Sequence, residues 1–200
     1  MHHFRRTFSL RFASFAFAAL LLAAASPQVR AATVLALDLP ALVKQSDYIV
    51  LANAQAESSR YRSQDRLIVT DVELRVIESL KGDAKVGGTV VATRLGGTVD
   101  RIGLTVPGEA SFAIGKSALV FLRKATSAKE LYVVGMSQGV LPIDGEGGSA
   151  RVLPGGAGSA LVQRQDNGKL APAPDALLTP QPLRDVLARI AQLVAGDHAR

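Results

Sequence analysis

An alternating stretch in the middle of the chain restricts its fold more than any other feature. Ile68, Thr70, Val72, Leu74 and Val76 alternate with Val69, Asp71, Glu73 and Arg75, a period of two that indicates a strand with one buried face. The pattern continues to Leu80 and stops at the turn signal Lys81-Gly82-Asp83. Such a strand would be about 40 Å long at roughly 3.3 Å per residue, whereas strands usually have about 3–10 residues. We therefore expect it to bend and serve two sheets, as in a barrel.

Shorter strands are predicted on both sides of this one. They cover residues 48–54, 89–94, 102–106, 118–122 and 131–136, and the last can continue through Ile143. Gly87-Gly88, Gly96-Gly97, Pro107-Gly108 and Gly115 separate the middle ones. Short strands between glycine and proline turns favour a β-sandwich or a β-barrel.

Two helices are predicted, one near each end of the folded region. Asp38 can cap a short helix over Leu39–Gln45, with Pro40 in its first turn. Near the C-terminus, apolar residues at helical spacing predict an amphipathic helix over 179–196, which we expect to dock on its own domain rather than on a partner. Between them, residues 144–178 are rich in Gly, Pro, Ala and Ser and are predicted to form a loosely ordered extension with one weak hairpin around 160–170.

The first 31 residues have the composition of a secretory signal peptide. A basic start (Arg5, Arg6, Arg11) precedes the apolar run 12–25, and small residues follow. Cleavage is expected after Ala31, with Ala25 as the second choice. The run is too short for a membrane span, so no stable span is expected after the leader is removed. The Sec pathway is favoured, although Arg5-Arg6-Thr7-Phe8 also resembles a twin-arginine signal. Both routes lead to the periplasm or the medium.

Removing the leader changes the charge that bears on function. Four of the 23 basic residues and none of the 17 acidic residues lie in 1–31, which leaves 19 basic against 17 acidic residues. This small excess disfavours nucleic acid as a ligand. The chain has no cysteine, so disulfides cannot hold the exported fold together and the core must do so.

Several motifs resemble catalytic or binding sites without completing one. Gly135-Met136-Ser137-Gln138-Gly139 matches the nucleophile elbow, but the next residues are strand-like and the only histidine beyond the leader is His198. Ser137 and Gln138 are instead expected to bond to nearby polar groups. Gly115-Lys116-Ser117 lacks the first glycine of a P-loop, since Ala110 occupies that place. Asp71 and Glu73 are expected on a solvated face, and no metal-ligand spacing is present. No catalytic, cofactor-binding or metal residue is therefore predicted, and no cofactor.

A wider layout resembles a known family. It consists of Ser46–Val50, then Thr70–Gly82 ending in Lys-Gly, then Leu119–Leu122 and Tyr132–Gly135. This order is similar to exported bacterial OB-like barrels of unassigned function, and to the N-terminal domain of netrin-like proteins and tissue inhibitors of metalloproteinases. The resemblance covers about residues 46–143 and implies an OB-like barrel. Together with the predicted helices it gives the expected fold: mainly β, with residues 32–143 as a five- to six-stranded OB-like Greek-key barrel, a short N-terminal helix and a C-terminal amphipathic helix. Those inhibitors bind zinc through an N-terminal cysteine, which this chain lacks.

These observations predict an exported, non-enzymatic binding domain whose partner is an extracellular or periplasmic protein or peptide. OB barrels bind through two loops and the face between them, which here would be Ser58–Arg66 and Arg123–Glu130. The candidate partner-binding residues are Arg60, Tyr61, Arg62 and Arg66. The alternatives are an inhibitor of an extracellular protease that does not chelate zinc through cysteine, and an enzyme with an unrecognised site.

Overall fold

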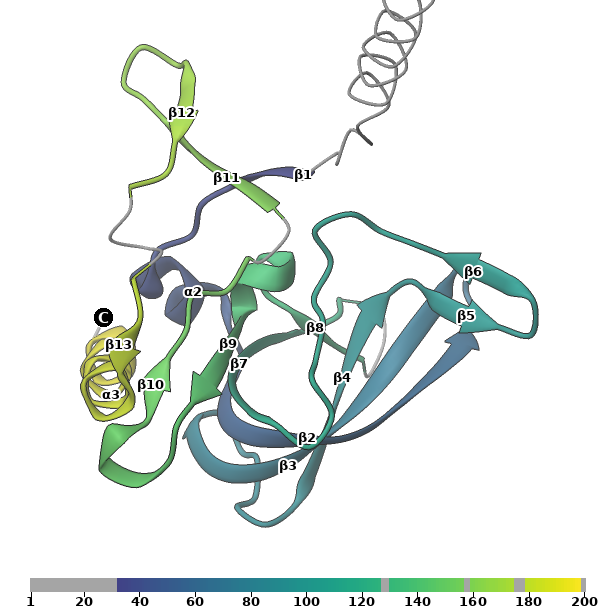
Figure 1. Ribbon diagram of the computed structural model, residues 1–200, viewed down its shortest axis with the longest axis horizontal. Coiled ribbons are helices and arrows are strands. Elements are labelled where there is room, and N and C mark those ends of the chain that lie inside the picture. Colours follow the sequence, from purple (N-terminus) through teal and green to yellow (C-terminus); the bar gives the residue numbers. More distant parts are fainter. Residues whose placement is uncertain (1–31, 127–129, 157–158, 175–178, 199–200) are drawn as a thin grey trace, which may run out of the picture. The chain divides into compact units, whose positions relative to one another are not determined.

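The computed structural model describes residues 32–126, 130–156, 159–174 and 179–198. The predicted leader, residues 1–31, lies outside them. Within the described residues the protein is mainly β, as the sequence predicted, with two α-helices, α2 (Leu39–Gln45) and α3 (Leu183–His198) (Figure 1). The boundaries of α2 are those predicted, and Asp38 caps it by accepting a hydrogen bond from the backbone N–H of Ala41.

Five strands pair in a closed circuit. They are β2 (Tyr48–Tyr61), β3 (Ile68–Lys81), β4 (Thr89–Leu95), β7 (Ser117–Lys124) and β8 (Leu131–Val133). β2 pairs with β3, β3 with β4, β4 with β8, β8 with β7, and β7 with β2. Only the β4–β8 pairing is parallel. Because the last pairing returns to the first strand, none of the five is left as a free edge of this circuit.

The two long strands, β2 and β3, allow this closure because they bend along their length. β3 is 14 residues long and pairs with β2 on one side and β4 on the other. β2 is equally long, although the sequence predicted that it would end at Ala54 and that a loop would begin at Ser58. It continues because β3 offers it backbone partners as far as Ile68, which is opposite Tyr61. Three register shifts in β2 mark irregularities at which the ladder can bend.

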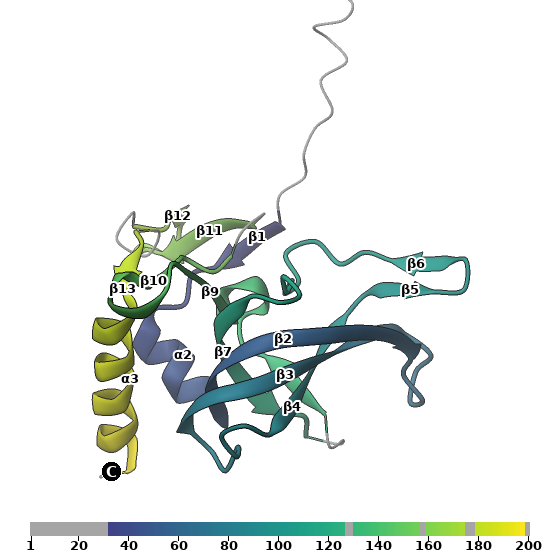
Figure 2. The same ribbon diagram turned by 60° about the horizontal axis from the view of Figure 1, so that its bottom comes forward.

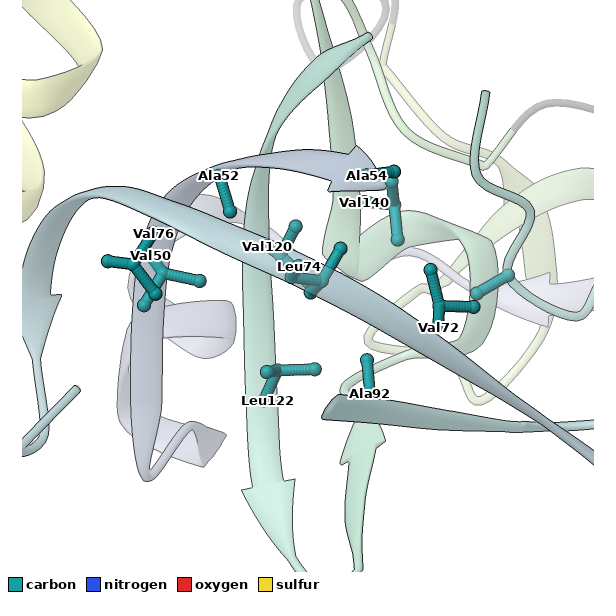
Figure 3. Packing of buried hydrophobic residues seen from close by; sticks show 11 residues of the cluster. Val50, Ala52, Ala54, Val72, Leu74, Val76, Ala92, Val120, Leu122 and Val140 are labelled. Carbon is teal, nitrogen blue, oxygen red and sulfur yellow. The ribbon is translucent and has the colours of Figure 1, made fainter. Parts of the chain in front are cut away.

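The interior of the circuit holds one of two hydrophobic clusters. Side chains from β2, β3, β4 and β7 point into it, and they include Val50, Val72, Leu74, Ala92 and Leu122 (Figure 3). The five residues predicted for the dry face of β3 (Ile68, Thr70, Val72, Leu74 and Val76) are all buried. Val69, predicted on the wet face, is also fully buried.

The second cluster lies on the other face of β2 and β7. Ile49, Leu51, Leu119 and Phe121 face α2 and α3, whose buried residues include Val43 and Ile190. Successive residues of β2 and β7 thus belong to alternate clusters, which explains why both strands read as continuous apolar runs. The C-terminal helix docks on its own domain, as expected. It starts at Leu183 rather than Thr179 and runs past Gly196 to His198.

The remaining strands lie outside the circuit. β9 (Val140–Asp144) pairs with β7, followed in order by β10 (Arg151–Val152) and β13 (Gln181–Pro182). β11 (Ser159–Arg164) pairs with β1 (Ala32–Leu35) and with β12 (Leu170–Pro172) in a small separate sheet. The described part of 144–178 therefore contains paired strands, with the β11–β12 hairpin close to its predicted place, whereas the sequence had suggested a loosely ordered extension.

A third, two-stranded sheet extends β4. β5 (Gly97–Val99) and β6 (Ile102–Leu104) form a hairpin that projects beside the turn between β2 and β3 (Figures 1 and 2). The sequence predicted a strand at 102–106 and assigned Gly96-Gly97 to one of the turns that separate strands, because glycine weakens the interior of a strand. Here Gly97 instead permits close packing. A Cβ at this position would overlap the hydroxyl oxygens of Ser59 and Thr70.

Candidate functional site

A row of polar side chains crosses the outer face of three neighbouring strands. Asp71 of β3 is opposite Thr93 of β4, and Thr93 is opposite Tyr132 of β8. The sequence neighbours Val72, Ala92 and Val133 pack in the interior cluster, so alternation directs these three polar side chains outwards. Thr93 is nevertheless buried and donates to Asp71 Oδ1 at 2.8 Å. Other side chains must therefore cover this face.

Arg60, near the end of β2, supplies part of that cover. Its Nε donates to Asp71 Oδ2 at 2.6 Å and its Nη2 donates to Glu130 Oε1 at 2.7 Å. The hydroxyl of Tyr132 donates to the other Glu130 oxygen at 2.6 Å. The Arg60 guanidinium thus donates hydrogen bonds to two carboxylates, those of Asp71 and Glu130, which are distant in the sequence.

Arg62 continues the same set of contacts into the β2–β3 turn. Its Nη1 donates to the Tyr132 hydroxyl at 2.9 Å, and its Nε donates to Asp65 Oδ1 at 3.0 Å. We refer to the connected side chains as the Arg60 network: Arg60, Arg62, Asp65, Asp71, Thr93, Glu130 and Tyr132.

The network favours the charged forms of Glu130 and Arg60 and the neutral form of Tyr132. Hydrogen bonds from Arg60 and then from Tyr132 lower the pKa of Glu130. Hydrogen bonds to Asp71 and Glu130 raise the pKa of the Arg60 guanidinium. Burial, followed by the hydrogen bond to Glu130, raises the pKa of Tyr132. At neutral pH the network is therefore a set of ion pairs bridged by a neutral phenol. This arrangement stiffens a surface and offers no free base.

The four predicted partner-binding residues divide into two pairs. Arg60 and Arg62 are held by carboxylates and a phenol within the protein. The predicted loop is wrong from Ser58 to Tyr61, which are strand residues, whereas a partner-binding role for the four residues stays a prediction. Arg60 and Tyr61 belong to β2, because the strand continues to Tyr61. Arg66 is exposed and lies over the Tyr61 ring, with its Cζ 5.1 Å from the ring centroid.

Sequence reasoning did not identify the acidic half of the network. The predicted second loop ended at Glu130, and this residue meets Arg60 although 70 positions separate them. Thr93 and Tyr132 were assigned only as strand residues. The alternation of Glu130 and Tyr132 around a Leu was a signal that both point outwards, but nothing in the sequence identified Arg60 and Arg62 as their partners.

Two exposed apolar side chains come from the β2–β3 turn and from the β5–β6 hairpin, which projects beside that turn (Figures 1 and 2). Leu67 follows Arg66 in the turn and is 42% exposed, and Ile102 of β6 is 60% exposed. The β5–β6 hairpin is fastened to β2 because the N–H of Thr98 donates to Ser59 Oγ at 3.3 Å. We refer to Tyr61, Arg66, Leu67 and Ile102 as the tip surface.

Ser137 is not placed as a catalytic nucleophile. Met136–Gly139 forms a 3-10 turn, and strand β9 follows instead of the helix that a nucleophile elbow requires. Gln138 bonds to backbone as expected, accepting from the N–H of Leu37 and donating to the carbonyl of Leu35. The prediction that Ser137 also forms a hydrogen bond is wrong. Its hydroxyl is buried and has no hydrogen-bond partner among the described residues.

The other motifs behave as simple structural elements. Gly115-Lys116-Ser117 leads directly into strand β7. Among the residues that the structure describes, no three His, Cys, Asp or Glu side chains are grouped so that they could hold a metal ion. No described helix is long and apolar enough to cross a membrane.

An apolar cavity of about 100 Å³ lies between the helices and the small sheet. Its lining includes Leu37, Leu42, Leu141, Leu161 and Val186. Gln138 also borders the cavity, but its amide is already bonded to backbone.

Comparison with known proteins leaves the geometry as the main guide to function. No family model, no curated protein and no solved structure matches this chain.

Proposed function

We propose that this protein is an exported, non-enzymatic binding domain that contacts a protein or peptide through the tip surface. The observation that supports the proposal is that the three arginines of this region differ in their environment. Arg60 and Arg62 are neutralised within the Arg60 network, whereas Arg66 stays exposed over the Tyr61 ring and precedes the exposed Leu67. Tyr and Arg are among the residues that are enriched at the energetic hot spots of protein interfaces.

The rigidity of the base supports the same proposal. Association costs less conformational entropy when the backbone of the binding residues is already ordered. The Arg60 network fixes the end of β2, and Ser59 holds the β5–β6 hairpin beside it. The tip surface is therefore presented by the ends of paired strands and by the short turn that joins β2 to β3.

We also propose that the five-stranded circuit is an OB-like Greek-key barrel. The closed pairing order and the enclosed apolar cluster support this. In such a barrel the turn after the first strand and the segment before the last strand would flank one binding face. Arg60, just before the first of these segments, and Glu130, at the end of the second, meet here. The resemblance to netrin-like domains and protease inhibitors stays a prediction.

The test is capture of a partner by the mature protein from its own culture supernatant. We expect that Tyr61→Ala and Arg66→Ala each weaken capture, because both remove tip contacts without touching the core. Arg184→Ala is the matched control, because this exposed arginine lies on α3. Equal capture by all variants would place the binding surface elsewhere, and a captured protease that loses activity would favour the inhibitor alternative.

Two further measurements test export and the enzyme alternative. The exported form should begin at Ala32, which N-terminal sequencing of the secreted protein can show.

Fluorophosphonate should leave Ser137 unlabelled, because its preceding turn residues Gly135 and Met136 lead into a strand and not into a catalytic elbow. Stoichiometric labelling that disappears in Ser137→Ala would replace the binding proposal with a hydrolase.

A further inference from the structure

The turn of the β11–β12 hairpin contains an exposed Asn-Gly pair, Asn167-Gly168. We propose that Asn167 is a site of spontaneous deamidation that converts this turn to aspartate and isoaspartate. The inference is independent of the proposed binding function. It rests on the local geometry of the turn and on the weak pairing of the hairpin that carries it.

The side chain of Asn167 is oriented over the following backbone. Its Oδ1 accepts a hydrogen bond from the N–H of Lys169 at 2.9 Å, an Asx-type turn in which the carboxamide folds back on its own chain. This places Cγ beside the intervening backbone nitrogen, that of Gly168. The N–H of Lys169 also polarises the carboxamide C=O, which makes Cγ more electrophilic.

Gly168 leaves the approach to its nitrogen open. It has a φ of +80°, which favours glycine, and a Cβ built there would meet no atom within 4 Å. With no side chain, nothing shields the nitrogen from the neighbouring Cγ. The opposing interaction is the hydrogen bond from the Gly168 N–H to the carbonyl of Gln165 at 2.8 Å, which must break before the nitrogen can react.

The hairpin can open readily enough for that bond to break. Its ladder has three registered pairs, and one of them contains Pro172, which has no N–H to donate. β12 is an edge strand of its three-stranded sheet and pairs only with β11, so the hairpin end that carries the turn has no neighbour on that side. Local opening therefore needs far less free energy than unfolding of the buried circuit.

The reaction needs only the chain and water. The Gly168 nitrogen loses its proton and bonds to Asn167 Cγ, and the Cγ–Nδ2 bond breaks, so that Nδ2 leaves as ammonia after taking up protons from solvent. The resulting five-membered succinimide is then hydrolysed by one water molecule. Opening at Cγ restores an α-linked backbone with aspartate, whereas opening at the backbone carbonyl gives isoaspartate, with one extra methylene in the main chain.

The other asparagine of the chain, Asn53, provides an internal control. Asn53 lies in β2, where its Nδ2 donates to the carbonyl of Gly115 at 3.0 Å. The following N–H, that of Ala54, donates to the carbonyl of Lys116 at 3.1 Å. Both reacting groups are thus held in a long ladder, and the next residue carries a side chain.

The experiment is incubation of the folded protein at mildly alkaline pH, with peptide mapping by mass spectrometry and an isoaspartate assay at intervals. We expect progressive loss of the unmodified Asn167 peptide, with isoaspartate and aspartate products, while the Asn53 peptide stays intact. Asn167→Gln should abolish the isoaspartate found in the peptide that contains residue 167, because the longer side chain would have to close a six-membered ring. A parallel sample unfolded in urea gives the rate for the chain without the hairpin.

Two results would overturn the proposal. The first is an intact Asn167 in the folded protein under conditions in which the urea-unfolded chain reacts, because the Gly168–Gln165 bond would then protect the site. The second is aspartate without isoaspartate, because direct hydrolysis would then have occurred without a succinimide.

Discussion

At the scale of single residues, Gly97 shows how one missing side chain positions the hairpin that carries part of the tip surface. Its backbone packs against the hydroxyl pair of Ser59 and Thr70, which lie 2.9 Å apart. Thr70 also donates to the carbonyl of Gly96 at 2.7 Å. The hydroxyls therefore serve as an anchor for β5, and any Cβ at position 97 would displace them.

We expect Gly97→Ala to destabilise the protein by about 1–3 kcal/mol through overpacking, in addition to the cost of its positive φ. Gly87→Ala is the matched control. Gly87 has a φ of +75°, but a Cβ there would meet no atom within 4 Å, so only the backbone cost of about 1–3 kcal/mol applies. Urea unfolding of both variants provides the measurement. Equal losses would mean that the hairpin can shift away from Ser59 at no cost.

At the scale of elements, the Arg60 network joins strands that share few backbone contacts. Arg60 on β2 reaches Glu130, which immediately precedes β8, although β3 and β4 lie between these strands in the sheet. Arg60 is 41% exposed and Glu130 is 17% exposed, so solvent weakens the pair. Its main role is to set the relative position of two chain segments rather than to add stability.

This contact predicts a pH dependence with a definite sign. Arg60 and Tyr132 lower the pKa of Glu130 in the folded protein. The stability that this contributes is therefore fully present above the unfolded pKa, about 4.3, and is lost as the pH falls through the folded value. Arg60→Met should reduce the loss of stability on acidification. Unfolding free energies measured from neutral to acidic pH test this, with Arg184→Met as the control. Parallel profiles for Arg60→Met and the wild type would contradict it.

At the scale of the whole molecule, two hydrophobic clusters share the same two strands. Val50 and Leu122 belong to the interior of the circuit, whereas Ile49 and Phe121 belong to the cluster under the helices. Loss of either cluster would expose one face of β2 and β7. We therefore infer that the circuit and the docked helices depend on each other.

This dependence predicts one cooperative transition. The chain has no tryptophan, so Leu187→Trp on α3 would introduce a probe at the second cluster, where Leu187 packs. Its fluorescence should change at the same urea concentration as the circular dichroism of the strands, because small domains usually unfold in two states. The wild-type midpoint, followed by circular dichroism, controls for damage by the tryptophan. Fluorescence that changes first would show that α3 detaches separately.

The sequence by itself determined the elements whose cause is local. Alternation from Ile68 onwards identified β3 and its buried face, and Asp38 with Pro40 defined the start of α2. The apolar stripe predicted α3, but its ends were misplaced by a few residues. These features depend on neighbours in the chain, so a single sequence contains the information.

Only the tertiary structure decided which distant segments meet. β2 runs to Tyr61 because β3 supplies partners, and Arg60 is neutralised because β8 brings Glu130 to it. Arg60, Arg62 and Arg66 look alike in the sequence, yet only Arg66 remains available at the tip. The physical reason is that ion pairs and strand ladders form between residues far apart along the chain, and their choice of partner depends on the closed circuit of strands.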